Sequence, residues 1–328
     1  MKIAVLDDWQ QVAAECADWL PLTDRAEVAF FHDNIADEDQ LVERLAPFDI
    51  LLTMRERTRF SASLIARLPK LRMLNVTGMR NLSVDVAALE ARGVVVSRTE
   101  AGEGGEATAE LALCLMLSAA RRVPAGDASV RAGTFQTGIA PGITLKGKTL
   151  GLIGLGRLGR MVAGYARALG MEVIAWSPNL TPERAAEAGV AYAPKEQLLR
   201  EADVVSLHIV LAPQTRGIIG ASELALMKPG AILVNTSRGP LIDEPALLAR
   251  LREGTLVAAL DVYNEEPLRL GHPLLSVPNT ILSPHLGYCA DVNFRVFYEQ
   301  AVENVLAFLD GSPIRVMPAS AGALSTQP

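Results

Sequence analysis

The stretch KTLGLIGLGRLGRMVAGYARALGMEVIAW, residues 148–176, joins a short apolar run to a glycine-rich turn, a helical pattern and a second apolar run. Gly154 permits the tight turn, Gly156 lets the backbone approach a phosphate, and Gly159 lets the helix pack closely on the strand. A helix that starts at such a turn presents free N–H groups to a pyrophosphate. GLGRLG between a strand and a helix therefore predicts an α/β unit that binds a dinucleotide.

The same alternation of apolar runs and helical patterns extends in both directions from this unit. Runs that we interpret as strands occupy residues 2–6, 50–53, 73–76 and 94–96 before it, and residues 232–234, 257–260 and 280–282 after it. Short apolar runs separated by helical patterns are typical of parallel sheets covered by helices. The fold class is therefore α/β, with two doubly wound parallel-sheet domains.

Four further segments complete the prediction. A helix is expected over residues 106–121, apolar around most of its circumference and therefore buried. Residues 124–147 are rich in Gly, Thr and Pro and predict an irregular connection. The last helix is expected over residues 294–309, and the ending SAGALSTQP predicts a disordered tail.

Composition excludes several classes of protein. The 328 residues are 50% hydrophobic and carry a net charge of −6, which leaves no basic surface for nucleic acid. The amino terminus MKIAVLDDWQ lacks the pattern of a signal peptide, and no apolar run is long enough to cross a membrane. Cys16, Cys114 and Cys289 have neither disulfide-framework nor metal-site spacing. We expect a cytoplasmic protein without a metal.

The end of the second strand in the dinucleotide unit bears on the choice between NAD and NADP. An acidic residue here would bind the ribose hydroxyls of NAD, but this chain has Ser177 in WSPNLT. Ser177, Asn179 and Thr181 can donate hydrogen bonds to a 2′-phosphate, and Arg184 is close in sequence. Our hypothesis is that NADP is accepted or preferred. The alternative is that Ser177 caps the turn and NAD binds through other contacts.

Three ionisable residues each follow a strand of the second half. Arg238 lies in NTSRG, Glu266 in DVYNEEP and His285 in SPHLG. The carboxyl ends of parallel strands open on one crevice, so these side chains are expected to converge. An imidazole with a carboxylate partner can exchange a proton, and a guanidinium can hold an anion. Reversible hydride transfer to a 2-keto acid needs this combination.

The motifs together resemble a known family. VSLHIVLAPQT at 205–215, MKPGAILVNTSRGPLIDE at 227–244, LDVYNEEP at 260–267 and SPHLG at 283–287 follow GLGRLG in the order found in the D-isomer-specific 2-hydroxyacid dehydrogenases. The resemblance covers nearly the whole chain and implies an NAD(P)-dependent oxidoreductase that interconverts a 2-keto acid and a D-2-hydroxy acid. Two alternatives are a catalytically vestigial nucleotide-sensing protein and a formate- or phosphite-type dehydrogenase. Formate enzymes carry glutamine where Glu266 stands.

The resemblance also implies a role for each catalytic residue. Arg238 holds the substrate carboxylate and keto oxygen, and polarises the carbonyl. His285 is the acid/base group, and Glu266 orients it and favours its protonated form. Asp261 resembles the residue that holds the nicotinamide carboxamide.

Contacts with bound molecules are implied in the same way. Cofactor-binding residues are expected at Thr108, Gly154, Gly156, Arg157, Leu158, Gly159, Ser177, Asn179, His208, Val210, Thr215, Thr236, Asp261 and Gly287. Substrate-binding residues are expected at Arg57, Gly78, Met79, Arg80, Arg238 and Tyr288.

Three of these positions depart from the family pattern. Val210 stands where a proline is usual, which puts the shape of its loop in doubt. Arg80 replaces a glycine in GMRNLSVD and would either favour an anionic substrate or point to solvent. Tyr288 replaces a small residue and would narrow the pocket.

The family fold implies a division of the chain. Residues 1–102 and 290–328 would form a flavodoxin-like substrate domain, and residues 103–289 a Rossmann dinucleotide-binding domain. The helix at 106–121 resembles the family's dimer-forming element, so a homodimer is expected.

Overall fold

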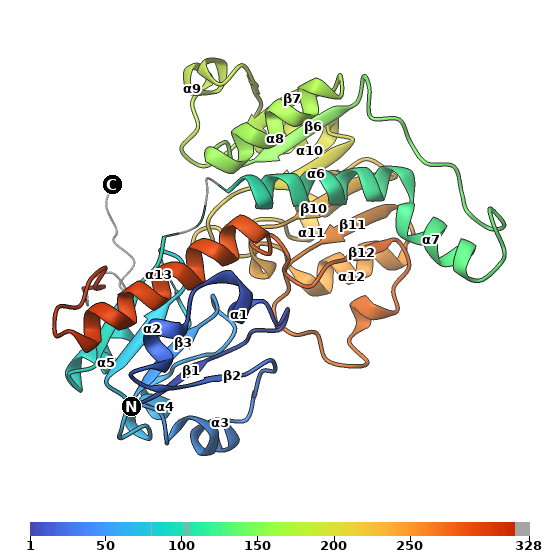
Figure 1. The fold of residues 1–328 in the computed structure, drawn as a ribbon. Coiled ribbons are helices and arrows are strands. Elements are labelled where there is room, and N and C mark those ends of the chain that lie inside the picture. The colour runs from blue at the N-terminus through green and yellow to red at the C-terminus, as the bar shows by residue number, and fades with distance from the viewer. Residues whose placement is uncertain (80, 101, 103–104, 319–328) are drawn as a thin grey trace. The chain divides into compact units, whose positions relative to one another are not determined.

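A computed structural model describes residues 1–79, 81–100, 102 and 105–318. Arg80 and the expected tail, from residue 319 onward, lie outside the described residues. The chain divides into two compact units, Met1–Gly104 with Ala290–Pro328 (unit 1) and Gly105–Cys289 (unit 2). Each contains one sheet (Figure 1).

Unit 1 is built on a five-stranded parallel sheet with the order β2-β1-β3-β4-β5. Its strands are β1 Lys2–Val5, β2 Glu27–Phe30, β3 Ile50–Thr53, β4 Met73–Val76 and β5 Val95–Arg98. Its helices are α1 Ala13–Cys16, α2 Leu20–Thr23, α3 Glu38–Leu45, α4 Ala62–Ala66, α5 Val86–Ala91 and α13 Asp291–Leu309. Strands β3 and β4 are wholly buried, as expected for central strands covered on both faces.

Unit 2 is built on a seven-stranded sheet with the order β12-β11-β10-β9-β6-β7-β8, and its paired strands are parallel. The strands are β6 Thr149–Ile153, β7 Glu172–Trp176, β8 Ala191–Tyr192, β9 Val204–Leu207, β10 Ala231–Asn235, β11 Leu256–Leu260 and β12 Thr280–Leu282. The α-helices are α6 Glu106–Arg121, α7 Val123–Arg131, α8 Arg157–Ala168, α9 Pro182–Glu187, α10 Lys195–Glu201, α11 Ala221–Leu226 and α12 Glu244–Arg252, with 3₁₀ turns η1 Gly239–Leu241 and η2 Pro273–Leu275. The predicted pair of parallel-sheet α/β units is confirmed.

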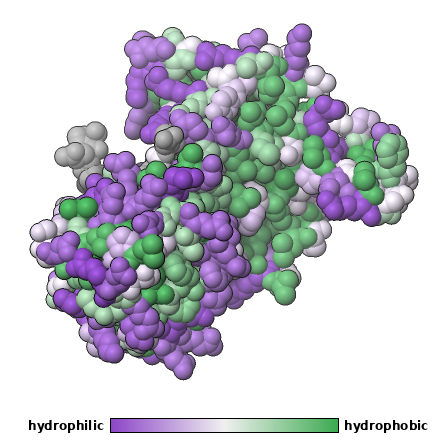
Figure 2. Space-filling view, viewed as in Figure 1, coloured by the Kyte–Doolittle hydropathy of each residue, from purple (hydrophilic) through white to green (hydrophobic). Residues whose placement is uncertain are grey.

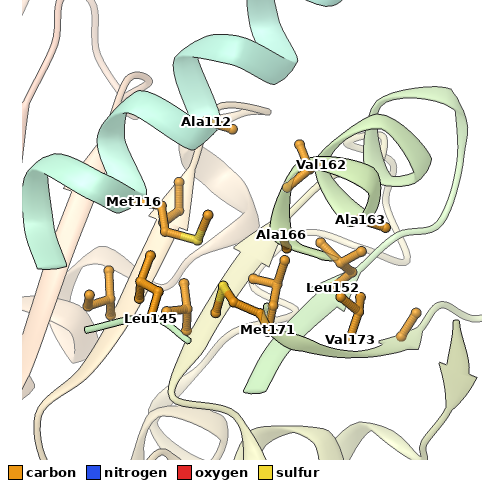
Figure 3. Packing of buried hydrophobic residues seen from close by; sticks show 14 of the residues in the cluster. Ala112, Met116, Leu145, Leu152, Val162, Ala163, Ala166, Met171 and Val173 are labelled. Atoms are coloured by element: carbon orange, nitrogen blue, oxygen red, sulfur yellow. The ribbon is translucent and has the colours of Figure 1, made fainter. Parts of the chain in front are cut away.

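Helices α6 and α8 cover one face of the unit 2 sheet. Met116 of α6 and Val162 of α8 are 1% exposed and face the apolar side chains of the strands, among them Leu152 of β6 (Figure 3). Small residues such as Ala112 and Ala163 let the helices approach closely. The sequence prediction of a helix over 106–121 has the observed bounds, and its buried residues lie along one side.

One sequence prediction is wrong. Residues 124–147 were expected to be irregular, but Val123–Arg131 forms α7. Proline is tolerated in the first turn of a helix because its missing N–H has no partner there, so Pro124 does not prevent α7 from forming. An ion pair between Asp127 and Arg131, one turn apart, further stabilises it. The prediction gave too much weight to Pro and Gly.

Other differences concern the ends of elements. The last helix begins at Asp291 rather than Phe294, and the strand β2 was not predicted. Ser61 is the N-cap of α4 and accepts a hydrogen bond from the Leu64 N–H at 3.1 Å. These small shifts leave the positions of the motifs unchanged.

Candidate active site

The glycine-rich turn lies where the order of the unit 2 strands reverses, between β6 and β9. Gly154 has φ +105°, and a Cβ atom on it would lie 2.3 Å from the carbonyl oxygen of His208. A Cβ on Gly159 would lie 2.2 Å from the Gly154 carbonyl oxygen. Both positions therefore exclude larger residues. Gly156, by contrast, has nothing within 4 Å of a Cβ. The folded chain therefore has room for a side chain here, and a need for glycine would come from a bound molecule.

This edge of the sheet fits a dinucleotide. Gly156 is the N-cap of α8, whose first residues are Arg157 and Leu158, and no side chain caps that helix. The helix therefore presents N–H groups to the open space at Gly156. Nearby strands contribute two buried polar atoms without hydrogen-bond partners among the described residues, Thr236 Oγ1 and His208 Nδ1. Since buried polar atoms are normally paired, these atoms are suited to a bound molecule.

His208 follows β9, and its second ring nitrogen, Nε2, is held by a hydrogen bond. Its Nε2 lies 2.9 Å from the Ser206 hydroxyl oxygen. Burial lowers the pKa of His208 from 6.5 to about 4, so the ring is neutral at neutral pH. A neutral imidazole can form a hydrogen bond with a bound molecule, but it carries no charge.

The loop after His208 is closed by Thr215, which is 7% exposed. The Thr215 hydroxyl donates to the Val210 carbonyl at 2.7 Å and accepts from the Ala212 N–H at 2.8 Å. Val210, which replaces a usual proline, is 76% exposed. The hydroxyl thus fixes the loop shape that the missing proline left in doubt.

The segment after β7 carries the residues expected to choose between NAD and NADP. Ser177 is partly buried and its carbonyl accepts from the Leu180 N–H at 3.1 Å. The Arg184 guanidinium donates to the Asn179 carbonyl at 2.9 Å. Thr181 caps α9 by accepting the Arg184 N–H. Arg184 therefore holds the segment together, which leaves the Asn179 amide exposed.

Arg238 follows β10 in a loop that the preceding residues hold. The Asn235 side-chain amide donates to the Arg238 carbonyl at 2.9 Å, and the Asn235 side-chain oxygen accepts from the Ser237 N–H at 3.0 Å. The Ser237 hydroxyl donates to the Leu207 carbonyl at 2.7 Å. Asn235 is fully buried, so this loop is fixed by the core of the sheet.

Glu266 and His285 form the hydrogen bond that the sequence predicts. Glu266 Oε2 lies 2.6 Å from His285 Nδ1, and Oε1 accepts from the Tyr263 N–H at 2.9 Å. Both side chains are largely buried, His285 being 14% exposed. The carboxylate therefore sets the imidazole orientation and leaves Nε2 as the ring nitrogen available for proton exchange.

Asp261, which follows β11, holds the SPHLG segment. Its carboxylate accepts from the Ser283 hydroxyl at 2.5 Å and from the N–H groups of Leu286 and Gly287 at 2.7 and 2.9 Å. Burial, above all other causes, raises the pKa of Asp261. Thr108 of α6 donates to the Gly287 carbonyl at 2.6 Å. Asp261 and Thr108 thus contact the segment that carries His285.

His285 itself has a left-handed backbone, with φ +55°. Only a minority of non-glycine residues adopt this conformation, which concentrates at functional sites. Its N–H donates to the Ser283 carbonyl at 3.0 Å. The Tyr288 ring packs edge-on against the imidazole, with 5.8 Å between ring centroids. Tyr288, expected to line the pocket, therefore lies beside the acid/base group.

The expected substrate residues Arg57, Gly78 and Met79 belong to unit 1. The Gly78 N–H donates to the Thr99 hydroxyl at 2.8 Å, so this amide is engaged within the unit. The Met79 carbonyl accepts from Arg98 at 3.2 Å. The Arg57 carbonyl accepts from Asn34 at 3.4 Å.

Arg55 has a closer connection to this turn than the sequence suggests. Its guanidinium donates to the Thr77 carbonyl at 3.2 Å, and Arg55 Nη1 occupies the place of a Cβ on Gly78. Arg57, the arginine expected from the sequence to bind substrate, lies two residues further on.

The residues that support the candidate catalytic side chains were not predicted from the sequence. Asn235, Tyr263 and Ser283 each hold a loop by hydrogen bonds. Each lies inside a motif already singled out, NTSRG, DVYNEEP or SPHLG. Their polar side chains next to buried strands were the available signal.

No cluster of three or more His, Cys, Asp or Glu side chains that could hold a metal occurs among the residues that the structure describes. Nor is any helix in these described ranges long and apolar enough to cross a membrane.

The fold and the site define a dinucleotide-binding oxidoreductase, and comparison with known proteins agrees. Residues 113–287 match the D-isomer specific 2-hydroxyacid dehydrogenase, NAD binding domain, family. A glyoxylate reductase of Aeropyrum pernix is 40% identical over 281 residues, which cover 83% of each chain. A D-3-phosphoglycerate dehydrogenase of Methanocaldococcus jannaschii is 40% identical over 252 residues, which cover 76% of this chain and 48% of that protein.

A solved structure agrees over a still larger part of the chain. The phosphoglycerate oxidoreductase from Vibrio cholerae o395 superposes with a TM-score of 0.90 at 37% identity, covering 95% of this chain and 99% of that one. The chain belongs to the D-isomer-specific 2-hydroxyacid dehydrogenase family. It is an enzyme of this class, a 2-hydroxyacid oxidoreductase that uses a nicotinamide cofactor.

Proposed function

We propose that this enzyme reduces a small 2-keto acid to the D-2-hydroxy acid, with Arg238, Glu266 and His285 as its catalytic residues. The observation that carries the proposal is the 2.6 Å contact between Glu266 and His285 Nδ1. It gives the chain a buried, oriented acid/base pair. Arg238 follows β10, the neighbour of β11, at the same edge of the sheet.

His285 moves the proton in this scheme. With Nδ1 directed at Glu266, the protonated Nε2 donates to the substrate carbonyl oxygen during reduction and removes the hydroxyl proton during oxidation. When bound, the nicotinamide supplies or accepts the hydride at the substrate carbon. Glu266 orients the imidazole, because its carboxylate oxygen lies 2.6 Å from His285 Nδ1.

Arg238 holds the substrate and stabilises the charge that develops on it. A guanidinium presents several N–H groups in one plane, so it can bind a carboxylate oxygen and the adjacent keto oxygen together. Its attraction to the keto oxygen grows as that oxygen becomes negative, which accelerates the chemical step.

The cofactor preference that we propose is for NADPH. Ser177 places no carboxylate at the end of β7, and the exposed Asn179 amide lies close in the sequence. Without negative charge, this segment does not repel a 2′-phosphate. The ratio of kcat/KM for NADPH to that for NADH measures the preference, and a value well below one contradicts it.

The substrates that we propose are glyoxylate and hydroxypyruvate. A relative named glyoxylate reductase matches over the same large share of both chains, which supports this choice. The arginines around the Gly78 turn, Arg55 and Arg98, favour an anionic substrate. Arg57, Met79 and Arg80 lie close in the sequence to Arg55 or Gly78, and we keep them as substrate-binding candidates.

A homodimer through α6 and α7 is also part of the proposal. Figure 2 shows hydrophobic residues gathered over α6 and on parts of α7. Val123, Val130 and Phe135 are 55%, 63% and 70% exposed, more apolar exposure than one segment of a monomer usually has. Light scattering after gel filtration should give twice the mass of 35.1 kDa, and Phe135→Asp should lower it.

The main experiment is a reductase screen with both cofactors over glyoxylate, hydroxypyruvate, pyruvate, oxaloacetate and bulkier 2-keto acids. The wild type should reduce at least one of them. His285→Ala should lower kcat by about 10²–10⁴-fold and leave cofactor binding intact, because a general acid contributes that much. A wild type that binds cofactor but reduces none of these acids would favour a nucleotide sensor instead.

A further inference from the structure

Tyr263 lies in DVYNEEP, three residues past β11, and contacts the loops of all three catalytic residues. It is partly buried, and its ring packs against the apolar cluster beneath the catalytic loops. Neither the acid/base chemistry nor the binding of Arg238 to substrate uses this side chain directly. Its hydrogen bonds nevertheless reach Glu266 directly and His285 through the Ser283 carbonyl.

The phenol joins two strand ends. Its oxygen lies 2.9 Å from the Ser283 carbonyl and 3.2 Å from the Leu260 carbonyl. Burial, together with the nearby carboxylates of Asp261 and Glu266, raises the pKa of Tyr263. The hydroxyl therefore keeps its proton and remains a donor throughout the pH range of an assay.

The Ser283 carbonyl, which accepts from Tyr263, also accepts the His285 N–H at 3.0 Å. One oxygen therefore holds both the phenol and the left-handed backbone of the acid/base residue. At the other end of Tyr263, its own N–H donates to Glu266 Oε1 at 2.9 Å. Glu266 Oε2 contacts His285 Nδ1 at 2.6 Å. These contacts form a closed circuit of hydrogen bonds through Tyr263, Glu266 and His285.

The backbone of Tyr263 also sets the position of the Arg238 loop. Gly239 lies so close that a Cβ on it would be 2.1 Å from the Tyr263 carbonyl carbon. Only glycine fits such an approach. Arg238 is the residue directly before this contact, so its backbone position depends on where Tyr263 lies.

We propose that Tyr263 is a positioning residue, whose hydroxyl holds the Ser283–His285 turn so that the imidazole keeps its alignment with Glu266. The inference rests on the proposed function for its kinetic consequence and goes beyond it by adding a residue that does not touch the substrate. The competing interpretation is that the ring only fills space. Tyr263→Phe separates the two, because it keeps the ring and removes the hydroxyl alone.

The test is steady-state kinetics of Tyr263→Phe with the best 2-keto acid found for the wild type. We expect kcat to fall about five- to tenfold, the effect of losing roughly one hydrogen bond, with little change in the cofactor KM. Tyr192→Phe is the matched control, because Tyr192 lies exposed on β8.

A double-mutant cycle identifies the route of the effect. If Tyr263 acts through the Glu266–His285 pair, Tyr263→Phe should cost much less in a Glu266→Gln background than in the wild type. Equal costs in both backgrounds, or an unchanged kcat in Tyr263→Phe, would overturn the proposal. A lower melting temperature with unaltered kinetics would leave only a packing role and would overturn it too.

The positioning can also be measured without turnover. In ¹⁵N-histidine-labelled protein, which has four histidines, the ring signals of His285 are assigned by comparison with His285→Ala. The Tyr263→Phe change should move them, while Tyr192→Phe should not. If the wild type reduced no 2-keto acid, the proposed function would fail. The comparison of the His285 ring signals would still decide whether Tyr263 positions His285.

Discussion

The carboxyl edges of the two sheets are built differently. In unit 2, hydrogen bonds of Asp261, Tyr263 and Ser283 join the ends of β11 and β12, and Asn235 holds the loop that follows β10. In unit 1, the corresponding edge has arginines that contact backbone carbonyls, and Asp7 and Arg55 in left-handed conformations. We therefore propose that the hydrogen bonds of unit 2 hold the reacting groups, and that the arginines of unit 1 supply positive charge for an anionic substrate.

The largest expected effect contrasts the arginines of the two edges. Arg238→Lys should lower kcat/KM by about 10²–10³-fold, because a lysine cannot bind two oxygens in one plane. Arg55→Lys in unit 1 should lower it by less than about tenfold. Steady-state kinetics with the same substrate measures both. Similar losses in the two variants would contradict the division of roles.

The next largest effect is the acid sensitivity of unit 2. Burial lowers the pKa of His208 to about 4 in the folded state, against 6.5 ordinarily. Between these values the unfolded chain binds the extra proton, so stability is full above about pH 6.5 and falls as the pH drops toward 4. The His208 contribution to this loss is at most about 3 kcal/mol.

Urea unfolding at several pH values, monitored by a signal from each unit, measures the slope of the unfolding free energy against pH. His208→Gln should flatten it, since glutamine does not titrate. An equally steep slope in His208→Gln would show that other groups cause the acid sensitivity.

Two buried aspartates test the same contrast at the level of stability. Asp261 accepts two backbone N–H groups that have no freedom to turn away, so Asp261→Asn should cost about 2 kcal/mol. Asp7 accepts from the side chains of Asn34 and Thr58, which can rotate. Asp7→Asn should therefore cost less than about 1 kcal/mol. Denaturant midpoints compare the two, and a reversed order would be evidence against the proposed rigidity of the unit 2 edge.

The smallest expected effect separates two adjacent carboxylates within DVYNEEP. Glu266→Gln should lower kcat about five- to tenfold, because an amide holds the imidazole less firmly than a carboxylate does. Glu265 is exposed and pairs with Arg269, so Glu265→Gln should leave kcat unchanged. Measuring kcat for both variants decides between them; a loss in Glu265→Gln alone would exchange their assignments.

Sequence alone was enough for the fold because the strands are uniformly apolar and the glycine turn has a fixed spacing. It also identified the Glu266–His285 contact, because strand ends on one edge of a sheet converge and the family resemblance selected Glu266 over Glu265. It did not find Tyr263 or Ser283 as supports, since their partners are backbone carbonyls and amides, which leave no mark on the pattern of residue types. Helix α7 was missed because Pro124 and Gly126 signal a break, although proline fits a first turn.

The dense hydrogen bonding around Asp261 has a practical consequence for engineering. Strands β11 and β12 pair with Ala258 opposite Thr280, and the bonds of Asp261 and Tyr263 depend on that register. An insertion or deletion in either loop would displace the donors and acceptors together. Residues 256–287 should therefore be transferred to a related scaffold as one block, while the Arg55 loop of unit 1 can be exchanged separately to alter substrate choice.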